Sequence, residues 1–320
     1  MVKRFLANKA TVCLMFFSFS FCLYTVPANT AGLAPTVGSI KIILDTDIGD
    51  DIDDAYAVAL ICSLPEARLI GVTTTFGQTD KRALIAAKLL EKAGRRDVPV
   101  FSGIAGEQKV GRQLEWAKDY KLLAKKTVGA LEFMRAEILK APGQITLVGI
   151  GALANIGALL EKYPDVRSKI KQIVIMGGAV YTGYAANSKP EPEWNIRCDA
   201  KAAKRVYESG VPLIMAGLEV TAMMQLDVER QKKIYARGTG LTDSLAALTM
   251  LWGGGTPTLF DPVAVAWALG HPFADSEQKK VVVENDGLTR IVEGTPNCTV
   301  LIHPRKEEFL NWFVDVVSRK

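Results

Sequence analysis

Six aspartates fall within residues 45–54, directly after the apolar run Ile42-Ile43-Leu44. Carboxylates this close repel one another, and the repulsion grows when they are removed from water. A bound divalent cation relieves it, and oxygen-only ligands favour Ca²⁺ or Mg²⁺, with Ca²⁺ preferred where many ligands are needed. Capping of the following helix explains one or two aspartates but not six. The spacing is not that of an EF-hand, which needs glycine and glutamate at fixed positions of its loop.

The remaining composition narrows the chemistry further. Among 320 residues there are only two histidines, His271 and His303, so a histidine-rich metal site is excluded. The formal net charge is +5, but three of the 39 basic residues fall in residues 1–28, so the rest carries 36 minus 34, or +2. No basic run with interleaved aromatic residues remains, so we expect no nucleic-acid partner.

The first 28 residues have the pattern of a secretory signal peptide. Lys3, Arg4 and Lys9 precede an apolar run over 11–26, and small residues allow cleavage after Ala28. The pattern predicts an exported protein, periplasmic or secreted, that does not associate with a membrane after cleavage. An uncleaved anchor over 5–26 is the alternative. No later segment is long and apolar enough to span a bilayer.

Three cysteines, Cys62, Cys198 and Cys298, follow the leader. In an exported chain two of them could pair, but the spacing assigns no bridge, and three buried thiols are the alternative.

Apolar runs alternate with helical patterns from residue 39 onward. Strands are expected at 39–44, 69–75, 98–101, 144–149, 172–176 and 211–216, and helices at 55–64, 79–93, 122–140, 153–162 and 200–209. This alternation predicts a single α/β domain over 40–317 with a mostly parallel, open central sheet flanked by helices. After Gly217 a helical elaboration is expected, with helices at 228–236, 242–252, 262–269 and 306–317 and two strands at 280–283 and 299–303.

The aspartates therefore follow a buried strand, at the sheet edge where open α/β folds bind ligands. In detail, Asp45-Thr46-Asp47-Ile48-Gly49 followed by Asp53-Asp54-Ala55 resembles the signature of the inosine-uridine preferring nucleoside hydrolases. Three further segments agree in order, at 145–155, at 174–179 with 193–196, and at 261–266. The resemblance covers nearly all of residues 40–317 and implies the same nucleoside hydrolase-like fold.

The resemblance also implies roles for individual residues. Side chains of Asp47, Asp54 and Asp261 and the carbonyl of Ile150 would be ligands of Ca²⁺, which in this family holds the ribose hydroxyls and a water. Asp53 would be the general base. Substrate contacts would come from Asp53, Met176, Glu193, Asn195, Phe260 and Asp261.

Several residues in these segments could have a structural role instead of binding substrate. Glu193 and Asn195 suit a polyol because carboxylate and amide groups together accept from and donate to hydroxyls, but they could instead hold a loop turn. Met176 could pack on ribose or simply end a buried strand. Asn155 could cap or buttress rather than touch substrate.

Three departures from the family pattern bear on the substrate. The aspartate loop is about two residues longer, so Asp50 and Asp51 are extra and Asp51 competes with Asp53 for the base position. Phe260 stands where many pyrimidine-active members have a histidine that protonates the leaving base; an aromatic residue there allows purine activation by stacking. Gln78 and Tyr184 replace two expected asparagines.

The leader and the resemblance together predict an exported, Ca²⁺-dependent hydrolase of the N-glycosidic bond of ribonucleosides. Because dimers and tetramers occur in the family, the resemblance also implies that a homodimer or homotetramer is possible. One alternative is a hydrolase of another ribosyl compound, with the metal and ribose sites kept and the base pocket changed. The other is a non-catalytic ribose- or nucleoside-binding protein, against which the presence of Asp53 argues.

Overall fold

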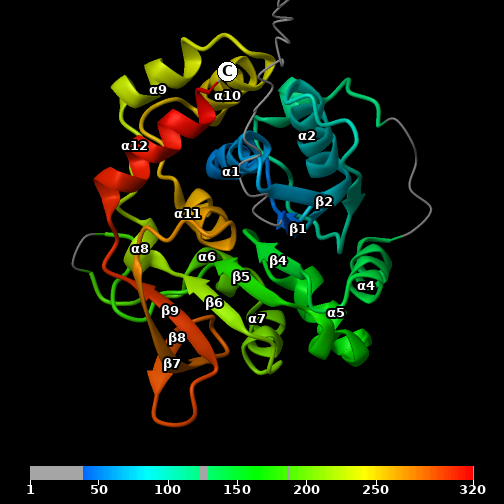
Figure 1. Ribbon diagram of the computed structural model, residues 1–320, viewed down its shortest axis with the longest axis vertical. Coiled ribbons are helices and arrows are strands. Elements are labelled where there is room, and N and C mark those ends of the chain that lie inside the picture. Colours follow the sequence, from blue (N-terminus) through cyan, green and yellow to red (C-terminus); the bar gives the residue numbers. More distant parts are fainter. Residues whose placement is uncertain (1–38, 123–128, 186–187, 320) are drawn as a thin grey trace, which may run out of the picture. The chain divides into compact units, whose positions relative to one another are not determined.

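A computed structural model describes residues 39–122, 129–185 and 188–319 (Figure 1). The predicted signal peptide, residues 1–28, lies outside these ranges. The strands are β1 (Ile40–Thr46), β2 (Ala67–Thr74), β3 (Val100–Ser102), β4 (Ile145–Gly149), β5 (Gln172–Met176), β6 (Leu213–Ala216), β7 (Asp275–Val283), β8 (Thr289–Val292) and β9 (Cys298–Ile302).

The helices alternate with the strands up to β6 and then follow one another. They are α1 (Asp53–Ser63), α2 (Thr79–Lys92), α3 (Leu114–Ala117), α4 (Ala130–Lys140), α5 (Ala154–Lys162), the 3₁₀ helix η1 (Pro164–Lys169), α6 (Trp194–Cys198), α7 (Ala200–Tyr207), α8 (Leu218–Thr221), α9 (Val228–Tyr235), α10 (Gly240–Trp252), α11 (Phe260–Ala268) and α12 (Lys306–Val317).

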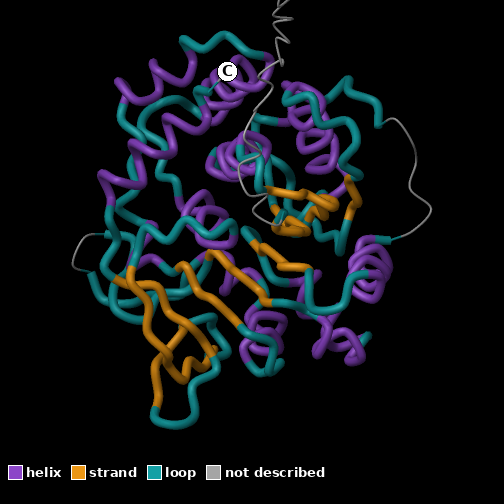
Figure 2. Tube along the Cα trace, in the orientation of Figure 1, coloured by secondary structure: helices purple, strands orange, loops and turns teal. Residues whose placement is uncertain are grey.

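The nine strands form one sheet in the order β3-β2-β1-β4-β5-β6-β9-β7-β8. All pairs from β3 to β9 are parallel, whereas β7 runs antiparallel to both β9 and β8. Figure 2 shows the strands as a band between helices, with the β7–β8 hairpin projecting at one end. The predicted mostly parallel, open sheet is therefore confirmed.

Helices cover both faces of the sheet, as a parallel sheet requires. One apolar core lies between the sheet and α1, α11 and α12, and the other between the sheet and α4, α5 and α7. Every residue of β4 is buried. The strand's continuous apolar pattern follows from this two-sided burial.

The element boundaries differ from the expected ones mainly at the ends. The expected 122–140 helix begins, within the described residues, only at Ala130, because Gly129 is extended with ψ of 166°; residues 123–128 are not described. Helix α11 begins at Phe260, earlier than expected, so Asp261 lies in its first turn. The short α3, α6 and α8 and the strand β8 were not expected, since each is too short for periodicity to reveal.

The structure also bears on cysteine pairing and on membrane-spanning helices. Cys62, Cys198 and Cys298 are all free thiols. In the described part of the chain, no helix combines the length and the apolar character that crossing a bilayer requires.

The sheet order fixes where a ligand can bind. From β1 the chain continues to β2 and β3 on one side, whereas β4 leads to β5 and β6 on the other. Connections therefore diverge between β1 and β4, and such a divergence leaves a crevice at the carboxyl ends of the strands. The aspartate loop follows β1 at this point.

Candidate active site

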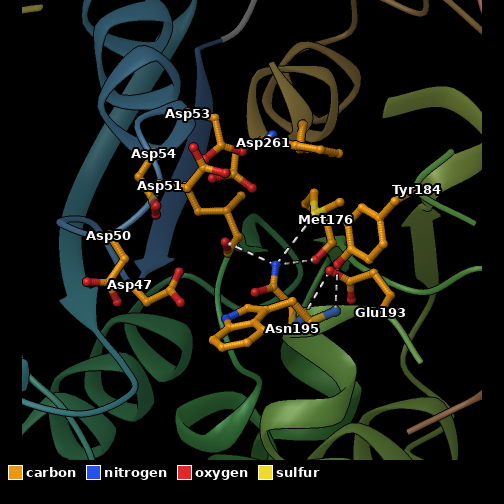
Figure 3. Close-up of a pocket in the computed structure, with 13 residues that line it drawn as sticks. Asp47, Asp50, Asp51, Asp53, Asp54, Met176, Tyr184, Glu193, Asn195 and Asp261 are labelled. Atoms are coloured by element: carbon orange, nitrogen blue, oxygen red, sulfur yellow. Dashed lines mark hydrogen bonds between the residues drawn. The ribbon is translucent and has the colours of Figure 1, made fainter. Parts of the chain in front are cut away.

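A cavity of about 190 Å³ lies at the carboxyl ends of the central strands (Figure 3). Its lining residues are Asp47, Asp50, Asp51, Asp53, Asp54, Ile150, Met176, Tyr184, Glu193, Trp194, Asn195, Phe260 and Asp261. Every residue that the sequence predicted for metal or substrate binding is among them. The structure thus brings together side chains from four separate segments of the chain.

Three carboxylates form the most compact group in this cavity. Asp53 and Asp54 open α1, Asp261 lies in the first turn of α11, and one oxygen of each lies within 4.8 Å of the others. The backbone N–H of Asp261 donates to Asp53 Oδ2 over 3.2 Å, and Thr46 Oγ1 donates to Asp54 Oδ1. These two bonds orient the group, which we call the carboxylate trio.

Burial raises the pKa of each trio carboxyl well above its usual value, and repulsion between the members raises it further. Such an arrangement is costly when ionised, because three buried charges lie side by side. A hard divalent cation would relieve the repulsion, and carboxylate oxygens are the ligands that such cations prefer. The donor set therefore fits a Ca²⁺- or Mg²⁺-like ion.

Asp47 and Ile150 lie on an adjoining wall and are not part of the trio. The Asp47 carboxylate lies close against Gly151, where an added Cβ would come within 2.6 Å of Asp47 Oδ1. Burial raises the pKa of Asp47 to about 7, which Arg82 partly offsets. The Ile150 carbonyl accepts from Asn195 Nδ2 over 3.3 Å. Both groups face the same cavity as the trio, as expected for further ligands.

Arg82, a fully buried arginine that the sequence pattern did not indicate, holds the aspartate loop. Arg82 donates from Nε to Phe76 O, from Nη1 to the carbonyls of Asp47 and Ile48, and from Nη2 to Asp50 Oδ2. Its exposed fraction is 0%. The available signal was its position on the apolar stripe of α2, in register with Ile85, Ala86 and Leu89.

The two extra residues of the loop have different surroundings. Asp50 pairs with Arg82 Nη2 at 2.6 Å and accepts from Gly111 N at 2.7 Å. Asp51 Oδ1 accepts from the backbone N–H of Ile52, and Asp51 does not belong to the trio. In this geometry it is Asp53, and not Asp51, that lies with Asp54 and Asp261.

The 193–195 segment combines a structural role with a place in the cavity. Glu193 caps α6 by accepting from the N–H groups of Asn195 and Ile196, and it also accepts from Gly178 N over 3.0 Å. Asn195 lies inside α6. Asn195 Nδ2 donates to Met176 O and Sδ, which leaves its Oδ1 as an acceptor for a hydroxyl.

Aromatic side chains form another wall of the cavity. The rings of Tyr184 and Phe260 meet edge to face, 6.1 Å apart, and Trp194 meets Phe76 in the same way at 6.0 Å. Tyr184 Oη accepts from Trp194 N over 2.9 Å. Burial raises the pKa of Tyr184, so its hydroxyl stays protonated at ordinary pH. The sequence identified Tyr184 as a departure from the family pattern, but only the structure shows its contact with Phe260.

Several polar residues near the motifs lie outside the cavity. Asn155 is fully buried and donates to Asp45 Oδ1 over 2.7 Å, so it buttresses the loop. Gln78 Oε1 accepts from Val110 N over 3.4 Å. His271 pairs with Glu66 and His303 lies 3.5 Å from Asp275, so neither histidine lines the cavity.

Comparison with known proteins agrees with this arrangement. Residues 42–311 match the sequence pattern of the inosine-uridine preferring nucleoside hydrolases. The pyrimidine-specific ribonucleoside hydrolase RihA of Escherichia coli (strain K12) is 30% identical over 311 residues, which span 87% of this chain and 98% of that protein.

Solved structures give the same picture. The purine-preferring ribonucleoside hydrolase from Gardnerella vaginalis is 26% identical, with a TM-score of 0.76 over 87% of this chain and 98% of that one. The plant nucleoside hydrolase PpNRh1 shares the fold at 24% identity, with a TM-score of 0.78 over 88% and 99% of the two chains.

Proposed function

This chain belongs to the inosine-uridine preferring nucleoside hydrolase family, whose members are glycosidases of N-glycosyl compounds, and on that premise we propose that it is an exported, Ca²⁺-dependent ribonucleoside hydrolase. One observation carries the proposal. The carboxylate trio shares a single cavity with Glu193 and Asn195, so a metal-binding group faces residues suited to a polyol. Water and a ribose ring can meet between them.

In the proposed mechanism the cation would be held by Asp54, Asp261, Asp47 and the carbonyl of Ile150. A bound Ca²⁺ would supply positive charge that draws in the ribose hydroxyls and makes a neighbouring water more acidic. Asp53 accepts the proton of the water that attacks the anomeric carbon, because its Oδ2 is held within the trio by the N–H of Asp261. The surrounding carboxylates stabilise the positive charge that develops on the sugar.

The ribose and the base would occupy different parts of the cavity. Glu193 and Asn195 orient the ribose, with Met176 packed beneath it. Phe260 and Tyr184 face the base, and stacking on Phe260 can activate a purine. The relatives do not settle the base by analogy, since one is called pyrimidine-specific and another purine-preferring.

The proposal is tested with residues 29–320, purified and assayed with and without a chelator. A panel of purine and pyrimidine ribonucleosides is supplied and free ribose is measured. We expect ribose release that stops on chelation and returns when Ca²⁺ is added. Absence of release from every nucleoside, despite bound Ca²⁺, would contradict the proposal.

The role of Asp53 has its own test. Asp53→Ala should lower kcat by about 10²–10⁴-fold, the usual size of a general-base contribution, while Ca²⁺ still binds. Asp51→Ala is the matched control for the neighbouring carboxylate. Full activity in Asp53→Ala together with loss in Asp51→Ala would move the base to Asp51.

Export is proposed on the leader pattern alone and is tested by mass. The chain recovered outside the cytoplasm should lack residues 1–28. A full-length chain that stays with the membrane would instead indicate an uncleaved anchor.

A further inference from the structure

The proposed active site carries more negative charge than its surroundings balance. Seven carboxylates line the cavity, and among the described residues no lysine, arginine or histidine does. Arg82 pairs with Asp50, and a divalent cation would offset two more charges, so four of the seven remain. Arg197 lies with its Cζ 5.1 Å from the centroid of the Trp194 ring but does not line the cavity.

Asp51 is the exposed member of this set that has no basic partner among the described residues. One of its oxygens accepts from Ile52 N over 2.7 Å, and the other has no hydrogen-bond partner in the part of the chain that the structure describes. Gln113 Nε2 donates to the Asp51 carbonyl over 2.7 Å and so fixes the backbone that carries this carboxylate. This carboxylate is therefore held at the cavity, where burial and the neighbouring Asp50 raise its pKa.

Aromatic rings line the same cavity. Tyr184, Phe260 and Trp194 all line the cavity. Aromatic faces attract cations and stack on flat heteroaromatic rings. A cavity that holds both these rings and unpaired carboxylates suits a flat ring carrying positive charge.

Among the described residues, the aromatic wall of the cavity offers no strong general acid for the leaving group. Phe260 cannot donate a proton, and both histidines lie elsewhere. Tyr184 is a weak acid whose pKa burial raises further. A neutral base therefore depends on stacking for its activation, whereas a base that is already cationic departs as a neutral molecule without being protonated.

We infer that this site is built for ribosides whose base carries a fixed positive charge, such as an N-ribosylpyridinium or an N7-alkylated purine riboside. The inference rests on the proposed nucleoside hydrolase function and names its substrate class. When the bond from the anomeric carbon to the ring nitrogen breaks, its electron pair neutralises the ring. The water oxygen bonds to the anomeric carbon, and the proton passes to Asp53 and then to solvent.

The test compares two matched pairs that differ mainly in charge. 7-Methylguanosine is compared with guanosine, and N-ribosylnicotinamide with its neutral dihydro form. Each kcat/KM is divided by the spontaneous hydrolysis rate of that compound, because a cationic base is intrinsically the better leaving group. We expect this ratio to be at least about tenfold higher for the cationic member, and the advantage to shrink as salt screens the cavity. Preference for only one pair identifies the ring type and still supports the inference.

Variants separate the charge of Asp51 from intrinsic reactivity. Asp51→Asn should lower the cation-to-neutral ratio about threefold, the size of a partly exposed charge interaction, and Asp51→Glu should restore it. Asp315→Asn removes the same charge from the exposed face of α12, outside the cavity, and should leave the ratio unchanged.

The outcomes distinguish the two proposals. Ca²⁺-dependent cleavage of neutral nucleosides without any advantage for the cationic member overturns this inference and leaves the proposed function standing. An unchanged ratio in Asp51→Asn also overturns the part assigned to Asp51. Failure to cleave any of the four compounds or any other nucleoside overturns both.

Discussion

Replacing Arg82 by methionine tests whether the aspartate loop is held in place from behind. Methionine keeps much of the apolar stem of arginine but has no N–H groups. The change removes the donors to the carbonyls of Phe76, Asp47 and Ile48 and the ion pair to Asp50. The methionine itself would pack among the apolar residues of α2.

The loss of stability depends on which hydrogen-bond partners of Arg82 remain inaccessible to water after the substitution. Each buried carbonyl that loses its donor costs about 1–3 kcal/mol. The Asp50 side chain is 40% exposed and can be rehydrated, so losing its pair costs about 0–1 kcal/mol. Together the three carbonyls and the pair span about 3–10 kcal/mol. Because single substitutions rarely cost more than about 5 kcal/mol, we expect Arg82→Met to lose about 3–5 kcal/mol of unfolding free energy. For a chain of this size that corresponds to a fall in Tm of about 5–8 °C.

The same change should weaken Ca²⁺ binding, because Arg82 fixes the backbone that carries Asp47. Loss of a supporting contact of this kind costs about 10–100-fold in metal affinity. Unfolding is followed by denaturant titration, and Ca²⁺ binding is measured by calorimetry. Arg82→Lys keeps the charge but not the planar fork, and should recover only part of both losses.

Two control variants test whether the loss is specific to the buried contacts of Arg82. Arg96→Met removes an arginine whose side chain is 62% exposed, and Asp50→Asn keeps all three carbonyl bonds. Each should cost no more than about 1 kcal/mol. If Arg82→Met unfolds within about 1 kcal/mol of the parent and binds Ca²⁺ equally well, Arg82 does not position the loop.

Other predictions follow from single contacts. Gly151→Ala should weaken Ca²⁺ binding by at least about tenfold in calorimetry, because its Cβ would come within 2.6 Å of Asp47 Oδ1; unchanged affinity would show that Asp47 is no ligand. Thr46→Val removes the donor to Asp54 and should cost about 1–3 kcal/mol in denaturant titration, whereas Thr46→Ser should not. Burial raises the pKa of Asp45 from 3.8 to about 7, so its folded form holds a proton that the unfolded chain loses at lower pH. Its contribution to stability is therefore complete below pH 3.8 and is lost as pH rises through about 7. Relative to the parent, Asp45→Asn should gain up to about 4 kcal/mol between pH 4 and 8, and a pH-independent difference would contradict this.

Much of the fold could be predicted from the sequence, because strand and helix patterns depend on residues that are close together in the chain. The expected strand at 172–176 and the expected helix at 306–317 coincide with β5 and α12. Both have an uninterrupted pattern over their whole length, continuous burial in the strand and a one-sided apolar face in the helix. Elements of four or five residues, such as α6 and α8, have too few positions to display a period.

The candidate site could be predicted from the sequence only in part. The aspartates directly after β1 indicated a cation site, because charge density is a local property of the chain. The dual position of Glu193 was not readable, since an N-cap and a cavity residue have the same sequence signature. Arg82 also escaped notice, because nothing in α2 itself indicates which carbonyls its guanidinium will meet.

The sequence by itself determined the types of residue, the strand–loop–helix order and the apolar periods that bury one side of each element. Only the tertiary structure decided which distant residues share the cavity. Asp53 and Asp261 are 208 positions apart, yet the N–H of one donates to the carboxylate of the other. That contact exists because α11 packs beside α1 over the same face of the sheet. Such packing depends on the order of the strands and the fit of side chains across the core, which no local pattern encodes.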